Sequence, residues 1–134
     1  MSKFVSVILL ASLLGPSAIS AQEILSPEEF KSYAEGKTLY FSQQGQPFGV
    51  EQYLPGQHSI WQYKDGTCIQ GIWYTRKTLI CFVYEGDGQE QCWHFLQKGK
   101  RFAARAEGRE SEADLEVVWR DDEPIQCKAP DLGV

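Results

Sequence analysis

The sequence has few of the residues and motifs on which most catalytic and metal sites depend. Only two histidines occur among the 134 residues, and no two cysteines have the C-x-x-C spacing of zinc sites and dithiol redox centres. The motifs G-x-S-x-G and H-E-x-x-H and a phosphate-binding loop are also absent. His58 precedes Ser59, but adjacent strand residues point to opposite faces and cannot pair as nucleophile and base. We therefore expect no catalytic site, no metal and no cofactor, and surface roles for His58 and His94.

A long hydrophobic run is also missing. The N-terminal apolar stretch, residues 5–14, is too short to anchor the chain across a bilayer. Lys3 precedes it, Gly15 and Pro16 break it, and small residues follow at Ala18 and Ser20, as in a secretory signal. We predict that residues 1–20 are a signal peptide, with cleavage after residue 21 as the alternative. The mature chain, residues 21–134, is then a single periplasmic or secreted domain that is not inserted in a membrane.

Acidic residues outnumber basic residues. The chain has 13 Lys and Arg against 18 Asp and Glu, and removing residues 1–20 takes away one lysine, which leaves a formal net charge of −6. This balance excludes nucleic acids and anionic membrane surfaces as expected partners. Eight of the acids lie between Glu107 and Glu123. They are interpreted as charged outer strand faces and a soluble loop, with a weak cation site or a docking patch for a basic protein as the alternative.

Four cysteines, all in the mature part, predict two disulfides in an exported protein. Strand pairing selects among the three connectivities. A turn over Glu85–Gly88 places Cys81 directly opposite Cys92, where Cβ atoms are close enough for a bond. Cys68 and Cys127 then pair by elimination, which would tie the C-terminal tail to the sheet.

The segment from Gly71 to Phe95 has apolar residues at every second position, as in antiparallel strands. With Arg76-Lys77 as the first turn, Trp73 lies opposite Ile80; with Glu85–Gly88 as the second, Ile80 lies opposite Trp93. Both hairpins put the same set on one buried face: Ile69, Gly71, Trp73, Ile80, Phe82, Trp93 and Phe95. Gly71 is then either a gap that lets Phe82 and a neighbouring tryptophan fit or a β-bulge.

Two further hairpins extend this face. A type I turn with a glycine bulge over residues 63–67 places Tyr63 opposite Thr67 and turns Trp61 inward. Near the C-terminus, Phe102 is expected opposite Trp119. The same register pairs Arg105 with Glu116 on the outer face.

The pattern as a whole predicts an all-β protein. Ser26, Pro27 and Glu29 mark the start of one short helix, which ends near Ala34 before Gly36. Eight strands follow at roughly ten-residue intervals, over residues 38–42, 48–54, 58–63, 67–74, 78–84, 91–97, 101–106 and 114–120. We predict a small eight-stranded antiparallel up-and-down barrel with the helix across one end; a flattened sandwich is the alternative.

The interior of such a barrel is either filled by side chains or able to hold one small ligand. The candidate ligand-binding residues are Gln52, Trp61, Tyr63, Trp73, Phe82, Trp93 and Trp119, with Gln52 as a polar anchor if it points inward. The first hypothesis is a non-enzymatic binding module for a small apolar ligand or a protein partner. The second is an exported inhibitor or structural accessory protein with a packed interior, and a small hydrolase has the least support.

Three short motifs connect the chain to a known group. They are C-x-x-G-x-W at Cys68–Trp73, C-F-x-Y-E at Cys81–Glu85, and C-W at Cys92–Trp93. In these motifs the chain resembles a group of small exported proteobacterial proteins, over about residues 48–102. The resemblance implies export and a β-fold, but no activity. The layout is also similar to lipocalin-type (calycin) barrels, as an architectural analogy only, since the region near Gly36 lacks their G-x-W signature.

Overall fold

The structure, a computed structural model, describes Gly15 and residues 22–129. The predicted signal peptide, residues 1–20, therefore lies almost entirely outside the described residues. None of the helices in the described part is long and apolar enough to cross a membrane.

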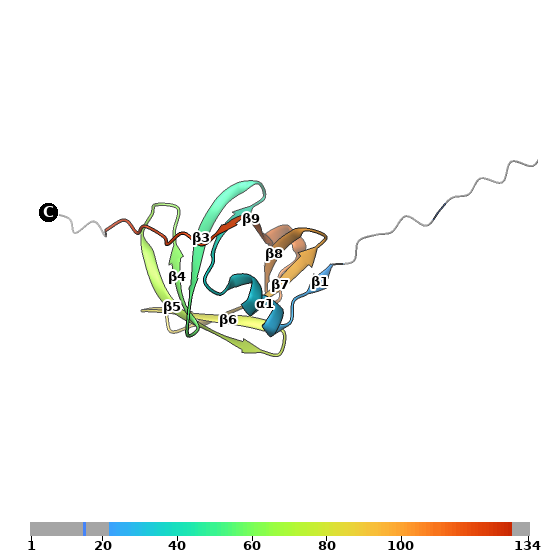
Figure 1. Cartoon of the computed structure of the whole chain (residues 1–134), viewed down its shortest axis with the longest axis horizontal. Coiled ribbons are helices and arrows are strands. Elements are labelled where there is room, and N and C mark those ends of the chain that lie inside the picture. Colours follow the sequence, from blue (N-terminus) through green and yellow to red (C-terminus); the bar gives the residue numbers. More distant parts are fainter. Residues whose placement is uncertain (1–14, 16–21, 130–134) are drawn as a thin grey trace, which may run out of the picture.

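Eight consecutive strands form a closed antiparallel barrel, as predicted (Figure 1). Each strand pairs with the next along the chain, and β2 pairs with β9 to close the ring. A closed sheet leaves no long open edge, and the sandwich alternative is wrong. The strands are β2 (Thr38–Gln43), β3 (Gln46–Leu54), β4 (His58–Gln62), β5 (Cys68–Arg76), β6 (Leu79–Tyr84), β7 (Glu90–Lys98), β8 (Arg101–Ala106) and β9 (Leu115–Asp121).

Two short elements were not predicted. Strand β1 (Glu23–Ile24) pairs with Gln97 and Leu96 of β7. It covers a part of β7 that β6 does not reach, because β6 pairs only with residues 90–93. A 3₁₀ turn, η1 (Ser111–Ala113), lies in the connection from β8 to β9.

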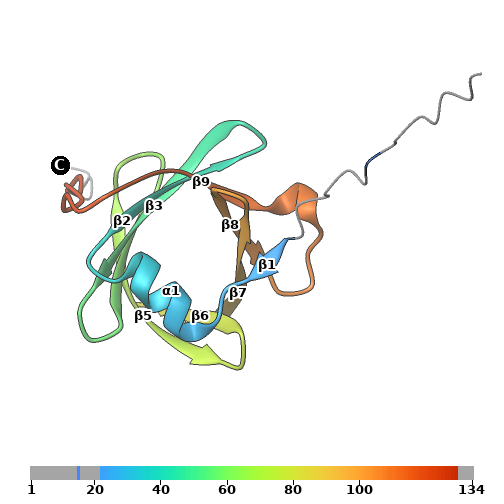
Figure 2. The same cartoon turned by 45° about the vertical axis from the view of Figure 1, so that its right-hand side comes forward.

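Helix α1 (Pro27–Ala34) lies across one end of the barrel, as predicted (Figure 2). The Ser26 side chain accepts a hydrogen bond from the Glu29 backbone N–H, and the Glu29 carboxylate accepts one from the Ser26 N–H. This capping box fixes where the helix begins. Phe30 is fully buried and contacts the rings of Tyr53, Trp73 and Phe95. The helix therefore plugs this end of the barrel with an aromatic cluster.

The predicted inner face of β5–β7 is confirmed, although one register differs. Ile80 pairs with Trp93 and Cys81 with Cys92, as expected. Trp73, however, pairs with Phe82 and not with Ile80, because the turn comprises Lys77 and Thr78. Lys77 takes the positive φ of 56° that this tight turn needs. The shift is two residues, so every side chain stays on the predicted face.

The predicted register of the last two strands is wrong. Phe102 pairs with Val117, not with Trp119. Between β2 and β9 a bulge lets Phe41 face Val117 while Tyr40 faces Trp119, which leaves Val118 as the extra residue. The bulge turns Trp119 outward, where 63% of its surface is exposed. Arg105 forms its ion pair with Asp114 rather than with Glu116.

Both predicted disulfides, Cys68–Cys127 and Cys81–Cys92, are present. The first ties down the chain that follows β9, which runs back over the outside of β3 and β4. There the Ile125 N–H donates to the Gln52 side-chain oxygen. The Lys128 N–H donates to the Gly66 carbonyl. The expectation that Gln52 points into the barrel is therefore wrong: this side chain lies outside and binds the tail.

Candidate ligand-binding cavity

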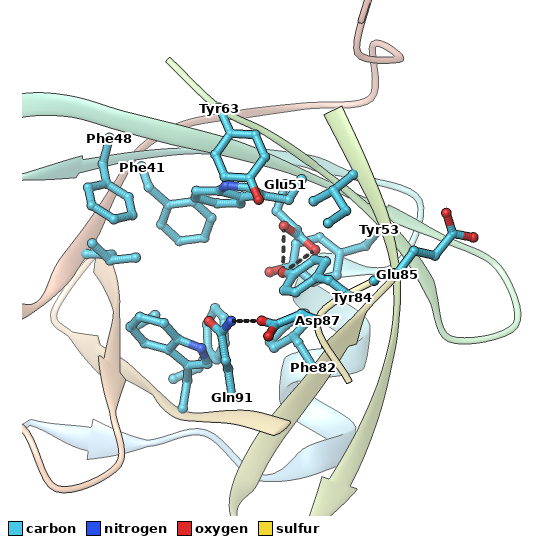
Figure 3. A pocket seen from close by; sticks show the side chains of 17 residues that line it. Phe41, Phe48, Glu51, Tyr53, Tyr63, Phe82, Tyr84, Glu85, Asp87 and Gln91 are labelled. Carbon is cyan, nitrogen blue, oxygen red and sulfur yellow. Dashed lines mark hydrogen bonds between the residues drawn. The ribbon is translucent and has the colours of Figure 1, made fainter. Parts of the chain in front are cut away.

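A cavity of about 760 Å³ occupies the half of the barrel that α1 does not fill (Figure 3). None of the helix residues lines it. Its rim includes Tyr63 and Glu85, Gly86 and Asp87 from the loop between β6 and β7. The mouth therefore lies at the end opposite α1. The volume falls within the range of small-molecule sites, about 300–1,000 Å³.

Aromatic rings make up most of the cavity wall. They come from five strands and the residue after β4: Phe41, Phe48, Tyr53, Trp61, Phe82, Tyr84, Trp93, Phe95 and Tyr63. Most of them are separated by even numbers along their strands, so they share the inner face. Phe48 is an exception, because a bulge between β2 and β3 interrupts the pairing at Phe41 and Ser42. The wall can accordingly surround an apolar molecule with ring faces and edges.

Two glycines make room for two of these rings. A Cβ atom on Gly49 would lie 2.1 Å from the Trp61 ring, and one on Gly71 would lie 2.7 Å from Cδ1 of Tyr84. Neither glycine could carry a side chain without moving its ring. Of the two expectations for Gly71, the gap is confirmed and the bulge is wrong, since the pairing on both sides is regular. The expected occupants are wrong, however, because the ring that fills the gap is Tyr84 and not Phe82 or a tryptophan.

Glu51 is the polar group at the base of the cavity. Its side chain is almost fully buried, with 2% of the residue surface exposed. The Tyr84 hydroxyl lies 3.1 Å from both carboxyl oxygens (Figure 3). Burial raises the pKa of this carboxyl to about 8, against the opposing effects of Ser59 and Tyr84. The Ser59 Oγ is buried and makes no hydrogen bond of normal geometry, whereas the Tyr84 hydroxyl does.

Four of the seven predicted ligand-binding residues line the cavity, namely Trp61, Tyr63, Phe82 and Trp93. Trp73 does not, because it lies deeper, against Phe30 of α1. Its indole N–H is buried without a hydrogen-bond partner. Gln52 and Trp119 lie on the outer surface, for the reasons given above.

The sequence interpretation missed Glu51. Val50, Gln52 and Leu54 lie on the outside of β3. Because Val50 and Leu54 are apolar, the pattern suggested that this set faces the interior and that Glu51 faces outward. The hairpin between β3 and β4 carried the correct signal. Its three-residue turn sets Leu54 opposite His58 and therefore Glu51 opposite Trp61. Once Trp61 was placed inside, Glu51 had to follow.

One group of side chains outside the cavity has the residue types of a metal site. Cys81, Glu90 and Cys92 lie close together on the outer face. Both sulfurs are held in the disulfide, so neither is available as a metal-binding thiolate. His58 and His94 are both absent from the cavity lining.

No family model, no curated protein and no solved structure matches this chain.

Proposed function

We propose that this protein is an exported, non-enzymatic binding module that holds a small, largely apolar molecule in the barrel. The observation that carries the proposal is the aromatic cavity of about 760 Å³ opening opposite α1. Apolar ligand sites typically combine such a wall with a few polar groups that orient the ligand. Here Glu51 and Tyr84 supply the polar groups.

Export is supported by the two disulfides, which persist in non-reducing compartments. It is also supported by the N-terminal signal pattern and by the resemblance to small exported proteobacterial proteins. The absence of a catalytic role is part of the proposal. Glu51 and Tyr84 form a pair at the base of the cavity, and the lining residues include no serine, threonine, cysteine, lysine or histidine to act with them.

The proposal is tested with a neutral fluorescent probe, N-phenyl-1-naphthylamine, added to the disulfide-bonded mature protein. We expect saturable binding of one probe per chain, with quenching of tryptophan fluorescence, because Trp61 and Trp93 line the cavity. Ile69→Trp places a larger side chain against the partly exposed wall near the mouth. It should weaken binding by about tenfold or more, a change of about 1.4 kcal/mol.

Trp119→Ser is the matched control, because this tryptophan lies on the outer surface. It should leave the probe affinity within about twofold. Circular dichroism of each variant establishes that the barrel is intact. Absence of saturable binding to the folded protein, or a large loss caused by Trp119→Ser with none from Ile69→Trp, would overturn the proposal.

A further inference from the structure

The charged residues of the cavity all have the same sign. Of the residues that line it, Glu51, Glu85 and Asp87 carry carboxyl groups, and none is a lysine, arginine or histidine. Glu85 points away from the cavity, whereas Asp87 lies at the mouth and accepts a hydrogen bond from Gln91 (Figure 3). A site with acidic groups at its base and rim attracts positive charge and disfavours anions.

Glu51 has no basic partner. No salt bridge joins it to any lysine or arginine among residues 22–129, and its hydrogen bonds come from the neutral phenol of Tyr84. Burying a carboxyl group without a cation is costly, and the cost of ionising it is seen in its raised pKa of about 8. A positive ligand group beside Glu51 would supply the missing partner.

The wall suits a cation as well as an apolar body. Trp61, Tyr63, Phe82 and Trp93 line the same space as Glu51. Aromatic rings attract ammonium groups, because the faces of their π-systems carry negative charge density. Rings and one carboxyl group together are the combination that recognises alkylammonium ions.

We propose, on the basis of the function proposed above, that the cavity binds an organic cation: an amine or quaternary ammonium with an apolar body and with its positive group against Glu51. When the cation enters, Glu51 loses its proton to solvent and becomes the counter-ion. The body of the ligand then occupies the aromatic space towards the mouth.

The proposal predicts a pH dependence that is assigned to Glu51. The other titratable groups facing it are Tyr53 on β3 and Tyr84 on β6, and burial raises the pKa of both phenols above their usual value of 10. Strands β4 and β5 contribute only Ser59, Trp61, Ile69 and Gly71 beside it. At the mouth the carboxyl group of Asp87 faces the cavity, whereas that of Glu85 points away. Affinity for a permanent cation should rise from pH 6 to about pH 8 and then level off.

The experiment compares two probes of the same shape, trimethyl(2-phenylethyl)ammonium and its uncharged carbon isostere, (3,3-dimethylbutyl)benzene. Each competes with N-phenyl-1-naphthylamine at pH 6 and at pH 8.5. We expect the cation to bind about tenfold or more tightly than the isostere at pH 8.5, and this preference to shrink at pH 6. Calorimetry in two buffers of different ionisation enthalpy should detect proton release when the cation binds at pH 7.

Glu51→Gln keeps the shape of the protonated side chain and removes its charge. It should weaken binding of the neutral dye much less than binding of the cation, and it should abolish both the preference for the cation and its pH dependence. Glu28→Gln is the control, since that exposed carboxyl group lies on α1, at the end of the barrel opposite the mouth, and it should keep the preference. If Glu51→Gln fails to fold, the pH profile and proton release of the unaltered protein test the same proposal.

The outcomes separate the two proposals. Dye binding without any advantage of the cation over the isostere would overturn the cation proposal and leave the binding function standing. Tighter binding of the isostere would point to a neutral ligand that contacts protonated Glu51. This result would also overturn the cation proposal and leave the binding function standing. A cation preference that survives in Glu51→Gln would overturn the role of Glu51. Failure of the dye and both competitors to bind would overturn the binding function itself.

Discussion

The hydroxyl of Tyr84 lies 3.1 Å from each carboxyl oxygen of Glu51. These residues are 33 positions apart in the sequence, and two strands, β5 and β4, lie between theirs. The contact is made across the inner face of the barrel, because Gly71 on β5 leaves space for the Tyr84 ring. The absence of a side chain at Gly71 thus allows the Tyr84 hydroxyl to reach the buried carboxyl group of Glu51.

Replacing Tyr84 with phenylalanine should destabilise the protein and raise the Glu51 pKa further. The hydrogen bond from Tyr84 lowers that pKa, whereas burial raises it. Without the hydrogen bond, the effect of burial is opposed less and the pKa rises. The loss of a buried hydrogen bond costs about 1 kcal/mol, with more if the acid is left unpartnered. Urea denaturation measures the stability, and carboxyl ¹³C chemical shifts measured against pH report the titration.

Tyr74→Phe is the matched control for that variant. Tyr74 also hydrogen-bonds a carboxylate, that of Glu90, but both groups lie on the outer face of the barrel. It should change stability much less than Tyr84→Phe and leave the Glu51 titration in place. Equal losses of stability from Tyr84→Phe and Tyr74→Phe would show that the buried hydrogen bond contributes no more than the exposed one.

Glu51 should also make stability depend on pH. Its pKa is about 8 in the folded protein and near 4.5 in the unfolded chain, so between these values the folded state binds more protons. The free energy of unfolding should therefore fall as pH rises from about 5 to 8, with a slope contributed by Glu51 of up to about 1.4 kcal/mol per pH unit. Below the unfolded pKa this contribution is fully present, and above pH 8 it is lost.

The measurement is urea denaturation at several pH values of the unaltered protein and of Glu51→Gln. Only the difference between the two curves belongs to Glu51, because other acids also titrate. A difference that does not change between pH 5 and 8 would mean that the carboxyl is ionised throughout that range, contrary to its buried position.

Gly71→Ala should lower stability by about 1–3 kcal/mol and weaken probe binding, because the added Cβ would overlap the Tyr84 ring and approach the Val83 carbonyl. The same substitution in a Tyr84→Ala background should cost less, since the ring is gone. A double-mutant cycle by urea denaturation measures this coupling. Additive effects would show that Gly71 is needed for some reason other than the space it leaves for Tyr84.

Much of the fold could be predicted because it depends on local patterns. Alternating residues and turn signals set the strands, and the order of Ser26, Pro27 and Glu29 set the helix start. The face shared by Trp73, Phe82 and Trp93 survived a wrong turn assignment, since a shift of two residues does not change which face a side chain occupies.

What could not be predicted depends on pairing between distant strands. The bulge that exposes Trp119 arises where β9 meets β2, about 80 residues earlier in the chain, and no local signal marks it. The outward position of Gln52 likewise depends on the tail around Ile125, which covers that face of β3. Glu51 is a different case: the adjacent hairpin between β3 and β4 carried the signal, but a charged residue is an unusual occupant of an inner face unless the site uses it.

Removing the Cys68–Cys127 disulfide should destabilise the protein more than its position on the outside of the barrel suggests. It joins residues separated by 59 positions. On the chain-entropy model this bond contributes about 4 kcal/mol, against about 3 kcal/mol for the 11-residue separation of Cys81 and Cys92. The comparison uses Cys68→Ala with Cys127→Ala, measured by urea denaturation against the unaltered protein.

The same variant has a local consequence that separates tail release from global loss of stability. Without the disulfide, the tail is held by contacts such as the Ile125 N–H bond to Gln52 and the Lys128 N–H bond to Gly66. Amide hydrogen exchange at Ile125 and Lys128 should therefore accelerate more than exchange at buried positions of β6, such as Phe82. Probe binding should persist under native conditions, because neither cysteine lines the cavity. Unchanged protection at Ile125 would show that hydrogen bonds alone hold the tail, and the stability assigned to this disulfide would then have to come entirely from the unfolded chain.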